Sequence, residues 1–215
     1  MSDVKNTKYM VTDIAHEKYP FLHRIRALRD IGNDVKEGDL GGFVEGEYNL
    51  CFEPGDTAWI YNDAIAAGCS VVDMASCLRD RAVVCDEAYI SQGSIVYGDA
   101  RVEDRAYIRG AVLKDHARAS GNAMILNSSD THRSPELSGN CVIYGKVAGE
   151  VRVSGSVIVF DTEEISNPSL DTFVINDQGR SIVRDPSRDE LAPHPHEEDR
   201  EEKAKPRNKA RGQSR

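Results

Sequence analysis

Small side chains recur every six residues along the middle of the chain. The series starts at Ala58, ends at Ala106, and holds only alanine or serine at each of its positions. An apolar residue follows each small residue two positions later, and Asp, Asn or Gly precedes it by two positions in seven of nine cases. The small positions are Ala58, Ala64, Ser70, Ser76, Ala82, Ala88, Ser94, Ala100 and Ala106.

This six-residue period predicts a parallel β-helix. An α-helix repeats at about 3.6 residues and a plain strand at about 2, so neither produces this period together with a fixed turn residue. A short strand, a corner and another short strand do produce it. Because side chains alternate along a strand, the small residue and the apolar residue both point inward. The small residue fits beside the corner and the apolar residue fills the coil, as in hexapeptide β-helices.

Three faces per coil would place residues eighteen positions apart on top of one another. The interior columns that result are apolar throughout, and each coil satisfies the backbone hydrogen bonds of its neighbours. The three columns are Ile60–Leu78–Val96, Ala66–Val84–Val102 and Val72–Ile90–Ile108. The predicted fold class is therefore all-β, with a parallel β-helix as its main element.

The repeat also sets the predicted domain organisation. One corner is a residue short, since the next small residue is Ala111, and the segment 127–138 interrupts the repeat as a corner loop before it resumes at Cys141. The segment 184–215 has almost no aliphatic content, which is typical of disorder. We expect an N-terminal cap at 1–35, the β-helix at 36–160, a C-terminal cap hairpin at 161–183 and a disordered charged tail at 184–215.

The corners and the lead-in resemble a known class of protein. The Gly-Asp-Ala and Asp-x-Ala corners are similar to those of the left-handed β-helix hexapeptide-repeat proteins. The stretch LHRIRALRDIGNDVKEGDLGGFVEGEYNL resembles the lead-in of uncharacterised phage- and prophage-borne members of that transferase-like superfamily. The resemblance covers about residues 20–160. It implies left-handed winding, a homotrimer and, for many members, acyl-CoA-dependent acyltransferase activity.

The outer side chains of one face predict a contact between subunits. Apolar residues follow the small residues of this face, and aromatic and cationic residues alternate beside them. An apolar column of this kind is rarely left in water, although scattered apolar residues on a solvated face are the alternative. The column comprises Trp59, Cys77, Ile95, Val112 and Val142, and the flanking residues are Tyr61, Arg79, Tyr97, Lys114 and Tyr144.

His132 is the candidate catalytic residue. Many hexapeptide acyltransferases carry a catalytic histidine on a loop that leaves the coil, and the stretch DTHRSPEL places His132 on such a loop. Histidine can take a proton from an acceptor hydroxyl or amine as the acceptor attacks the thioester of acyl-CoA. A solvated histidine is the alternative, and the short loop and few later coils favour it. Acyl-CoA is expected only if the acyltransferase hypothesis holds; otherwise no cofactor is expected.

Two groups of residues are candidates for ligand binding. Arg24 and Arg26 precede the first coil and would share one face of a strand, where they could hold a small anionic ligand or cover an end cap with their aliphatic stems. Tyr89, Tyr107 and Arg109 are further candidates within the repeat.

Composition narrows the class of partner and the compartment. The net charge of −9 argues against specific nucleic-acid binding, and the basic run after Glu202 belongs to the tail. Five cysteines without a C-x-x-C pair predict reduced thiols in a cytoplasm. No metal site is expected, since only His116 and His132 lie in the repeat. No apolar run approaches the ~20 residues that a membrane-spanning helix needs.

Three function hypotheses follow. The first is a phage or prophage accessory protein, host-cytoplasmic and for instance counter-defensive, that acts by binding a host protein or a small anionic ligand. The second is an acyltransferase that uses His132. The third is a structural component of a phage particle.

Overall fold

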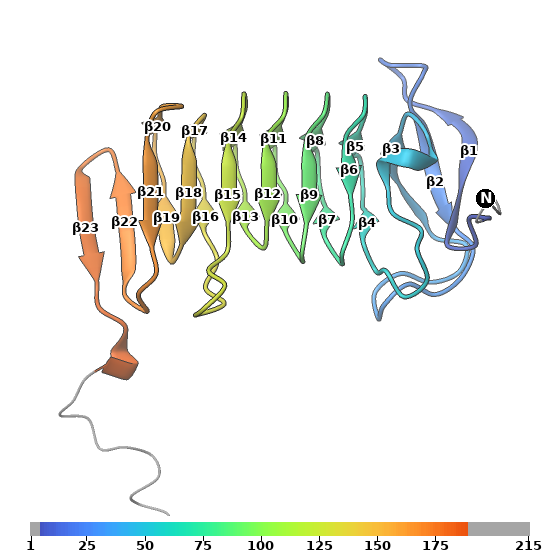
Figure 1. The fold of residues 1–215 in the computed structure, drawn as a ribbon. Helices are drawn as coiled ribbons and strands as arrows, with labels where there is room; N and C mark the ends of the chain where they lie inside the picture. The colour runs from blue at the N-terminus through green and yellow to red at the C-terminus, as the bar shows by residue number, and fades with distance from the viewer. Residues whose placement is uncertain (1–4, 189–215) are drawn as a thin grey trace, which may run out of the picture. The chain divides into compact units, whose positions relative to one another are not determined.

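Short strands wind around a common axis and stack in successive coils (Figure 1). The structure, a computed structural model, describes residues 5–188. It is a parallel β-solenoid of about seven turns with coils of about eighteen residues. The described residues contain no α-helix, only two 3₁₀ turns, η1 (Glu47–Asn49) and η2 (Pro186–Arg188). The predicted all-β fold class and parallel β-helix are therefore confirmed.

The strands form three sheets, one on each side of the solenoid. Sheet A contains, in order, β1 (Tyr9–Ala15), β2 (His23–Ala27), β3 (Leu40–Val44), β5 (Ile65–Ala66), β8 (Val83–Val84), β11 (Arg101–Val102), β14 (Arg118–Ala119), β17 (Val142–Ile143) and β20 (Ile158–Val159). Sheet B contains β4 (Trp59–Ile60), β7 (Cys77–Leu78), β10 (Ile95–Val96), β13 (Val112–Leu113), β16 (Glu136–Leu137), β19 (Val151–Val153), β22 (Thr172–Asn176) and β23 (Gly179–Val183). Sheet C contains β6 (Val71–Val72), β9 (Tyr89–Ser91), β12 (Tyr107–Arg109), β15 (Met124–Leu126), β18 (Lys146–Gly149) and β21 (Glu164–Asn167).

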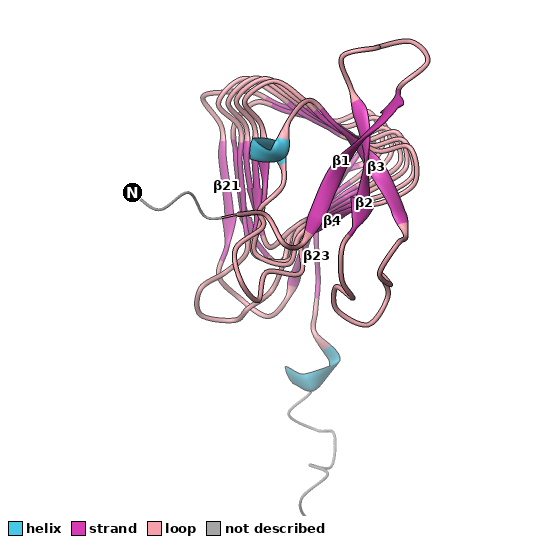
Figure 2. Ribbon diagram, turned by 90° about the vertical axis from the view of Figure 1, so that its right-hand side faces the viewer, coloured by secondary structure: helices cyan, strands magenta, loops and turns pink. Residues whose placement is uncertain are grey.

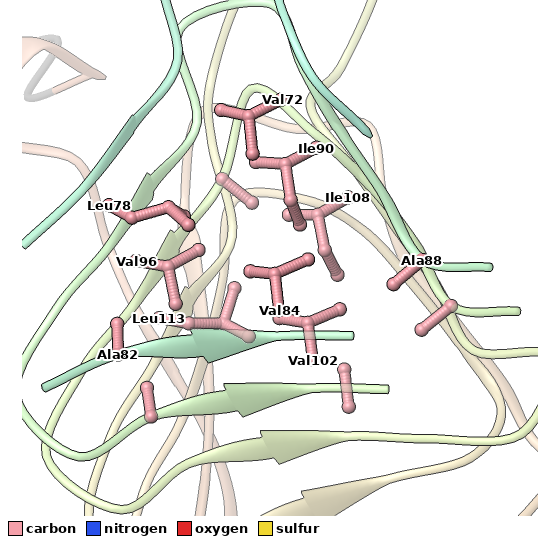
Figure 3. Packing of buried hydrophobic residues seen from close by; sticks show 14 of the residues in the cluster. Val72, Leu78, Ala82, Val84, Ala88, Ile90, Val96, Val102, Ile108 and Leu113 are labelled. Atoms are coloured by element: carbon pink, nitrogen blue, oxygen red, sulfur yellow. The ribbon is translucent and has the colours of Figure 1, made fainter. Parts of the chain in front are cut away.

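The predicted interior columns are confirmed by the register of the parallel pairs. Leu78 pairs with Val96 in sheet B, and Val84 pairs with Val102 in sheet A, each eighteen residues apart. Their side chains point into the coil and stack on one another (Figure 3). Viewed along the axis, the coils superpose on one three-sided outline (Figure 2). The left-handed winding that the resemblance implies stays a prediction.

The corners use the left-handed backbone conformation. Eight successive corner residues, from Asn62 to Asp104, have φ between 47° and 73°. Gly, Asn and Asp tolerate this conformation better than other residues do, which explains their recurrence two positions before each small residue. The corner carboxylates also bind the next coil: Asp80 accepts the N–H of Gly98 at 3.0 Å, and Asp86 accepts that of Asp104 at 3.1 Å. The corner positions therefore join coils as well as turn the chain.

The short corner is confirmed, but the end of the corner loop was misplaced. Ile95 pairs with Val112, seventeen residues later, because Gly110 alone turns that corner. Val112 in turn pairs with Glu136, so the solenoid resumes inside the segment 127–138 and not after it. The small position of that strand is taken by Pro135, whose carbonyl accepts the N–H of Val112 at 3.0 Å. Because the predicted repeat was identified by alanine or serine at each small position, a proline at this position was not recognised as part of it.

The N-terminal strands close the first end of the solenoid. β1 pairs antiparallel with β2, and β2 pairs antiparallel with β3, which continues into the parallel part of sheet A. The Lys8 side chain is fully buried beneath them, 3.0 Å from Asp56, and donates to the Cys51 carbonyl at 2.7 Å. Burial lowers the pKa of Lys8, and the hydrogen bond to Asp56 opposes that shift. This ion pair ties the N-terminal segment to the first coil.

At the other end, β22 and β23 form the predicted antiparallel hairpin. The chain divides after Val183, and the second unit, residues 184–215, has described structure only up to residue 188. The disorder predicted for 184–215 and the basic run after Glu202 therefore fall almost entirely outside the described residues. Within residues 5–188, no helical segment has the length and hydrophobicity that crossing a membrane requires.

Candidate functional site

The predicted contact face lies on the outer side of sheet B. Cys77, Ile95 and Val112 stand in register on three adjacent strands and are half-buried. Trp59 continues this column but is only 1% exposed, since the N-terminal cap covers it and its ring lies 6.3 Å from that of Tyr9. Trp59 is therefore a core residue and has no surface to offer a neighbouring subunit.

The predicted flanking residues lie beside this column in its first two coils. The Arg79 guanidinium lies 4.5 Å from the centre of the Tyr61 ring, a cation–π contact. Val142 does not belong here, because it pairs with Arg118 in sheet A, and Glu136 takes its place beside Val112. The apolar column thus covers three coils and ends at Glu136, which binds Lys114. Val142 was assigned to the wrong face because the strand that follows Pro135, β16, was not recognised as part of the repeat.

His132 stands alone on the exposed corner loop. Its backbone has φ of 55° and its N–H donates to the Ser128 carbonyl at 3.1 Å. Within the described residues, no acidic or basic side chain is hydrogen-bonded to its imidazole. A general base usually needs a partner that fixes its orientation, and the loop supplies none. The catalytic role of His132 stays a prediction.

The five ligand-binding candidates do not form one site. Arg24 and Arg26 lie on β2 at the start of sheet A, whereas Tyr89, Tyr107 and Arg109 lie on sheet C. The Tyr89 and Tyr107 rings are neighbours, with centroids 5.6 Å apart. The hydrogen bond from the Tyr89 hydroxyl to Asp73 raises the pKa of that phenol to about 12. Arg109 donates to Asn127 at the base of the corner loop, at 3.0 Å.

Arg24 lines the edge of a hollow between the tip of the N-terminal hairpin, residues 14–18, and the rest of sheet A. Its guanidinium lies 4.3 Å from the centre of the Phe43 ring and donates to the carbonyls of Gly41 and Asn62 at 2.9 and 2.7 Å. Its other terminal nitrogen binds Asp63 at 2.5 Å. Four contacts hold this cation in place, so its charge is preorganised at the edge of the hollow.

The hollow has an apolar floor and a charged rim, and its volume is about 600 Å³. Phe43 and Ile65 form the floor as part of a second, smaller hydrophobic cluster. Two further cations line the rim, Lys18 from the hairpin turn and Arg81 from the corner before β8, together with the carboxylates of Glu17 and Asp63. Arg81 donates hydrogen bonds to both carboxylate oxygens of Asp99, each at 2.7 Å, and these bonds lower the pKa of Asp99. The Arg81 side chain is nevertheless 73% exposed.

His16 shapes the hairpin side of this hollow. Its Nδ1 accepts the backbone N–H groups of Lys18 and Tyr19 at 3.1 and 3.2 Å, so the ring carries its proton on Nε2. The ring packs edge-on against Phe43 with centroids 4.7 Å apart. The hairpin conformation and the apolar floor are thereby fixed to one another.

Comparison with known proteins adds no assignment to this geometry. No family model, no curated protein and no solved structure matches the chain. Within residues 5–188, no group of three or more His, Cys, Asp or Glu side chains is placed to hold a metal ion. Any functional conclusion therefore depends on the side chains described above.

The sequence pointed to Arg24 but missed the rest of the hollow. His16, Lys18 and Arg81 are separated along the chain, and Arg81 lies within the repeat, where one more charged residue carries no signal. The His-Glu-Lys-Tyr-Pro turn before Phe21 was the one local cue, since a polar turn of this kind marks a hairpin tip.

Proposed function

We propose that the protein acts by binding, and that the hollow between the N-terminal hairpin and sheet A takes a small organic anion with an apolar part. The observation that carries this proposal is that three cations, Lys18, Arg24 and Arg81, surround an apolar floor. Two carboxylates line the same hollow, Glu17 and Asp63, and Asp63 is paired with Arg24. Small-molecule sites commonly combine an apolar lining with a few placed polar groups. Carboxylate or phosphate would pair with the cations, and the apolar part would lie on the floor.

The three cations at the rim differ in how strongly they are already bound to other groups of the protein. The Arg24 side chain is 24% exposed and is already paired with Asp63, which offsets its charge. Arg81 is mostly exposed, and Lys18 makes only a cation–π contact with Tyr19, at 5.1 Å. Lys18 can therefore turn toward a ligand at little cost, whereas Arg81 stays bound to Asp99 and contacts a ligand from that position. We assign these two cations the direct contacts.

Isothermal titration calorimetry tests this site. We expect hexanoate to bind, and hexanol, which shares its chain but lacks its charge, to bind at least about ten-fold more weakly. The double variant Lys18→Gln/Arg81→Gln loses the preference for the anion, whereas Arg105→Gln, at an exposed corner outside the hollow, keeps it. Failure of hexanoate, inorganic phosphate and ATP alike to bind would refute the proposal.

We also propose that copies of the protein associate through the outer face of sheet B, as a homotrimer. The aligned apolar column supports this proposal, because covering it with a neighbouring copy removes apolar surface from water and stabilises the assembly. The column consists of Cys77, Ile95 and Val112. Light scattering should give a mass that is a multiple of three times 23.8 kDa. Ile95→Asp should lower it, and Arg101→Asp on sheet A should not. If the apolar column instead binds a host protein, Ile95→Asp leaves the mass unchanged and abolishes capture of that protein.

The corners and the lead-in sequence support a place among the phage-borne hexapeptide-repeat proteins, and with it an accessory role in a host cytoplasm. The acyltransferase and phage-structural alternatives gain no support from a specific contact.

A further inference from the structure

The strand β23 is the outermost strand of sheet B and has one neighbour, β22. Figure 1 shows it at the C-terminal end of the solenoid. All five of its residues are exposed, with Ile182 at 68% and Val183 at 55%. At the opposite end of the same sheet, Trp59 on β4 is buried under the N-terminal cap. Among the described residues, nothing covers the β23 edge in the same way.

The hydrogen-bond pattern shows which backbone groups of β23 are open. In β22, the Phe173 N–H donates to Glu150 at 2.9 Å, and the Ile175 carbonyl accepts from Ser154 at 3.0 Å. Both residues therefore direct their backbone groups toward β19, and Val174 between them directs its groups toward β23. Ser181 is the register partner of Val174, so its backbone groups point back to β22.

It follows that the neighbours of Ser181 face the other way. Backbone directions alternate along an antiparallel strand, so the N–H and C=O groups of Arg180 and Ile182 point away from β22. An exposed row of such groups is a template for pairing with another strand.

We propose that β23 pairs antiparallel with β23 of a second copy, about a two-fold axis at Ser181. This register places Arg180 of each copy opposite Ile182 of the other, so their open backbone groups can form two pairs of hydrogen bonds. No like charges face each other, and the aliphatic stem of Arg180 covers the exposed Ile182. The contact is isologous and therefore closes as a dimer of this edge.

The sequence of β23 contains none of the usual protections of an edge strand. Proline, a bulge or an unpaired charge commonly blocks such pairing. The one charged residue, Arg180, lies 3.3 Å from Glu163, which offsets its charge. The strand thus remains competent to pair.

A cysteine cross-link tests the register in the full chain. Ser181 would face its own copy as a non-hydrogen-bonded pair, with Cα atoms about 4.5 Å apart, which is within the range of a disulfide. Ser181→Cys should form a disulfide-linked dimer under mild oxidation, with the 181–181 bond identified by mass spectrometry. Gln178→Cys, whose two copies would lie about 20 Å apart, should not exceed the wild-type background of the five native cysteines.

Proline substitutions separate pairing from folding. Ile182→Pro removes an N–H on the open side only, so it should abolish association through this edge. At a dilution where the wild-type edge is also unpaired, its melting temperature should equal that of the wild type. Ser181→Pro removes an N–H that bonds to β22, so it should lower the melting temperature as well. Wild-type chain that is monomeric, Ser181→Cys that cross-links no more than Gln178→Cys, or association unaffected by Ile182→Pro would each overturn the proposal.

Discussion

Enlarging a single small residue at a corner should destabilise the solenoid sharply. Ala100 is fully buried and stands between the equivalent residues of the coils on either side, Ala82 and Ala117. Its carbonyl accepts the N–H of Val83 at 3.0 Å, and the next N–H, of Arg101, donates to Ala117 at 3.0 Å. The backbone around Ala100 is therefore fixed on both sides.

Ala100→Leu adds three carbon atoms where neighbouring coils already fill the space. Overpacking a close-packed interior costs about 1–3 kcal/mol, and we expect the upper part of that range because two hydrogen-bonded strands must separate to make room. Each kcal/mol lowers the melting temperature of a chain of this size by roughly 2–4 °C.

Urea and thermal unfolding, followed by circular dichroism, measure this effect. Arg101→Leu is the matched control, since it places the same side chain on the adjacent residue, whose side chain is exposed. A surface substitution of this kind changes stability by about 0.5 kcal/mol or less. If the two variants unfold at the same urea concentration, the corner is not the narrow site described here.

Three further results are expected. Lys8→Met should cost about 3 kcal/mol, the low end for a broken buried ion pair, because Asp56 loses its cation but keeps the N–H groups of Ala58 and Met74. Fluorescence of the sole tryptophan, Trp59, should report the loss. Burial raises the pKa of the Cys141 thiol from 9.0 to about 11, so the unfolded chain loses this proton first and stability falls as pH rises through that window; Cys141→Ala should weaken the fall in urea titrations. His132→Ala should leave thermal shifts with acetyl-CoA unchanged, and protection seen only in wild type would favour the acyltransferase.

The interior of the solenoid was predictable because its constraints are local and repeat. Each corner needs a small residue, an inward apolar residue and a turn residue that accepts positive φ, and these occur at fixed spacing. The pattern failed where one coil meets these needs differently. Pro135 takes a small position, and the buried Val151 takes the equivalent position on the next strand of sheet B, β19.

The surface was less predictable because it depends on contacts that the repeat does not encode. Trp59 fits the outer column by spacing, yet the N-terminal strands bury it. The hollow around Arg24 brings together a hairpin tip and two coils, and Arg81 enters it from within the repeat. Such sites depend on how the N-terminal cap packs on the solenoid, and the sequence repeat carries no information about that packing.

Nuclear Overhauser contacts between alanine methyl groups test the stacking of the coils most directly. The experiment uses protein that is isotope-labelled at its alanine methyl groups. Ala82 and Ala100 lie on adjacent coils, about 4.8 Å apart by the spacing of paired strands. We expect a strong contact between Ala82 and Ala100, a second between Ala100 and Ala117, and none between Ala82 and Ala88, which occupy different corners. A contact between Ala82 and Ala88 without one between Ala82 and Ala100 would contradict the solenoid.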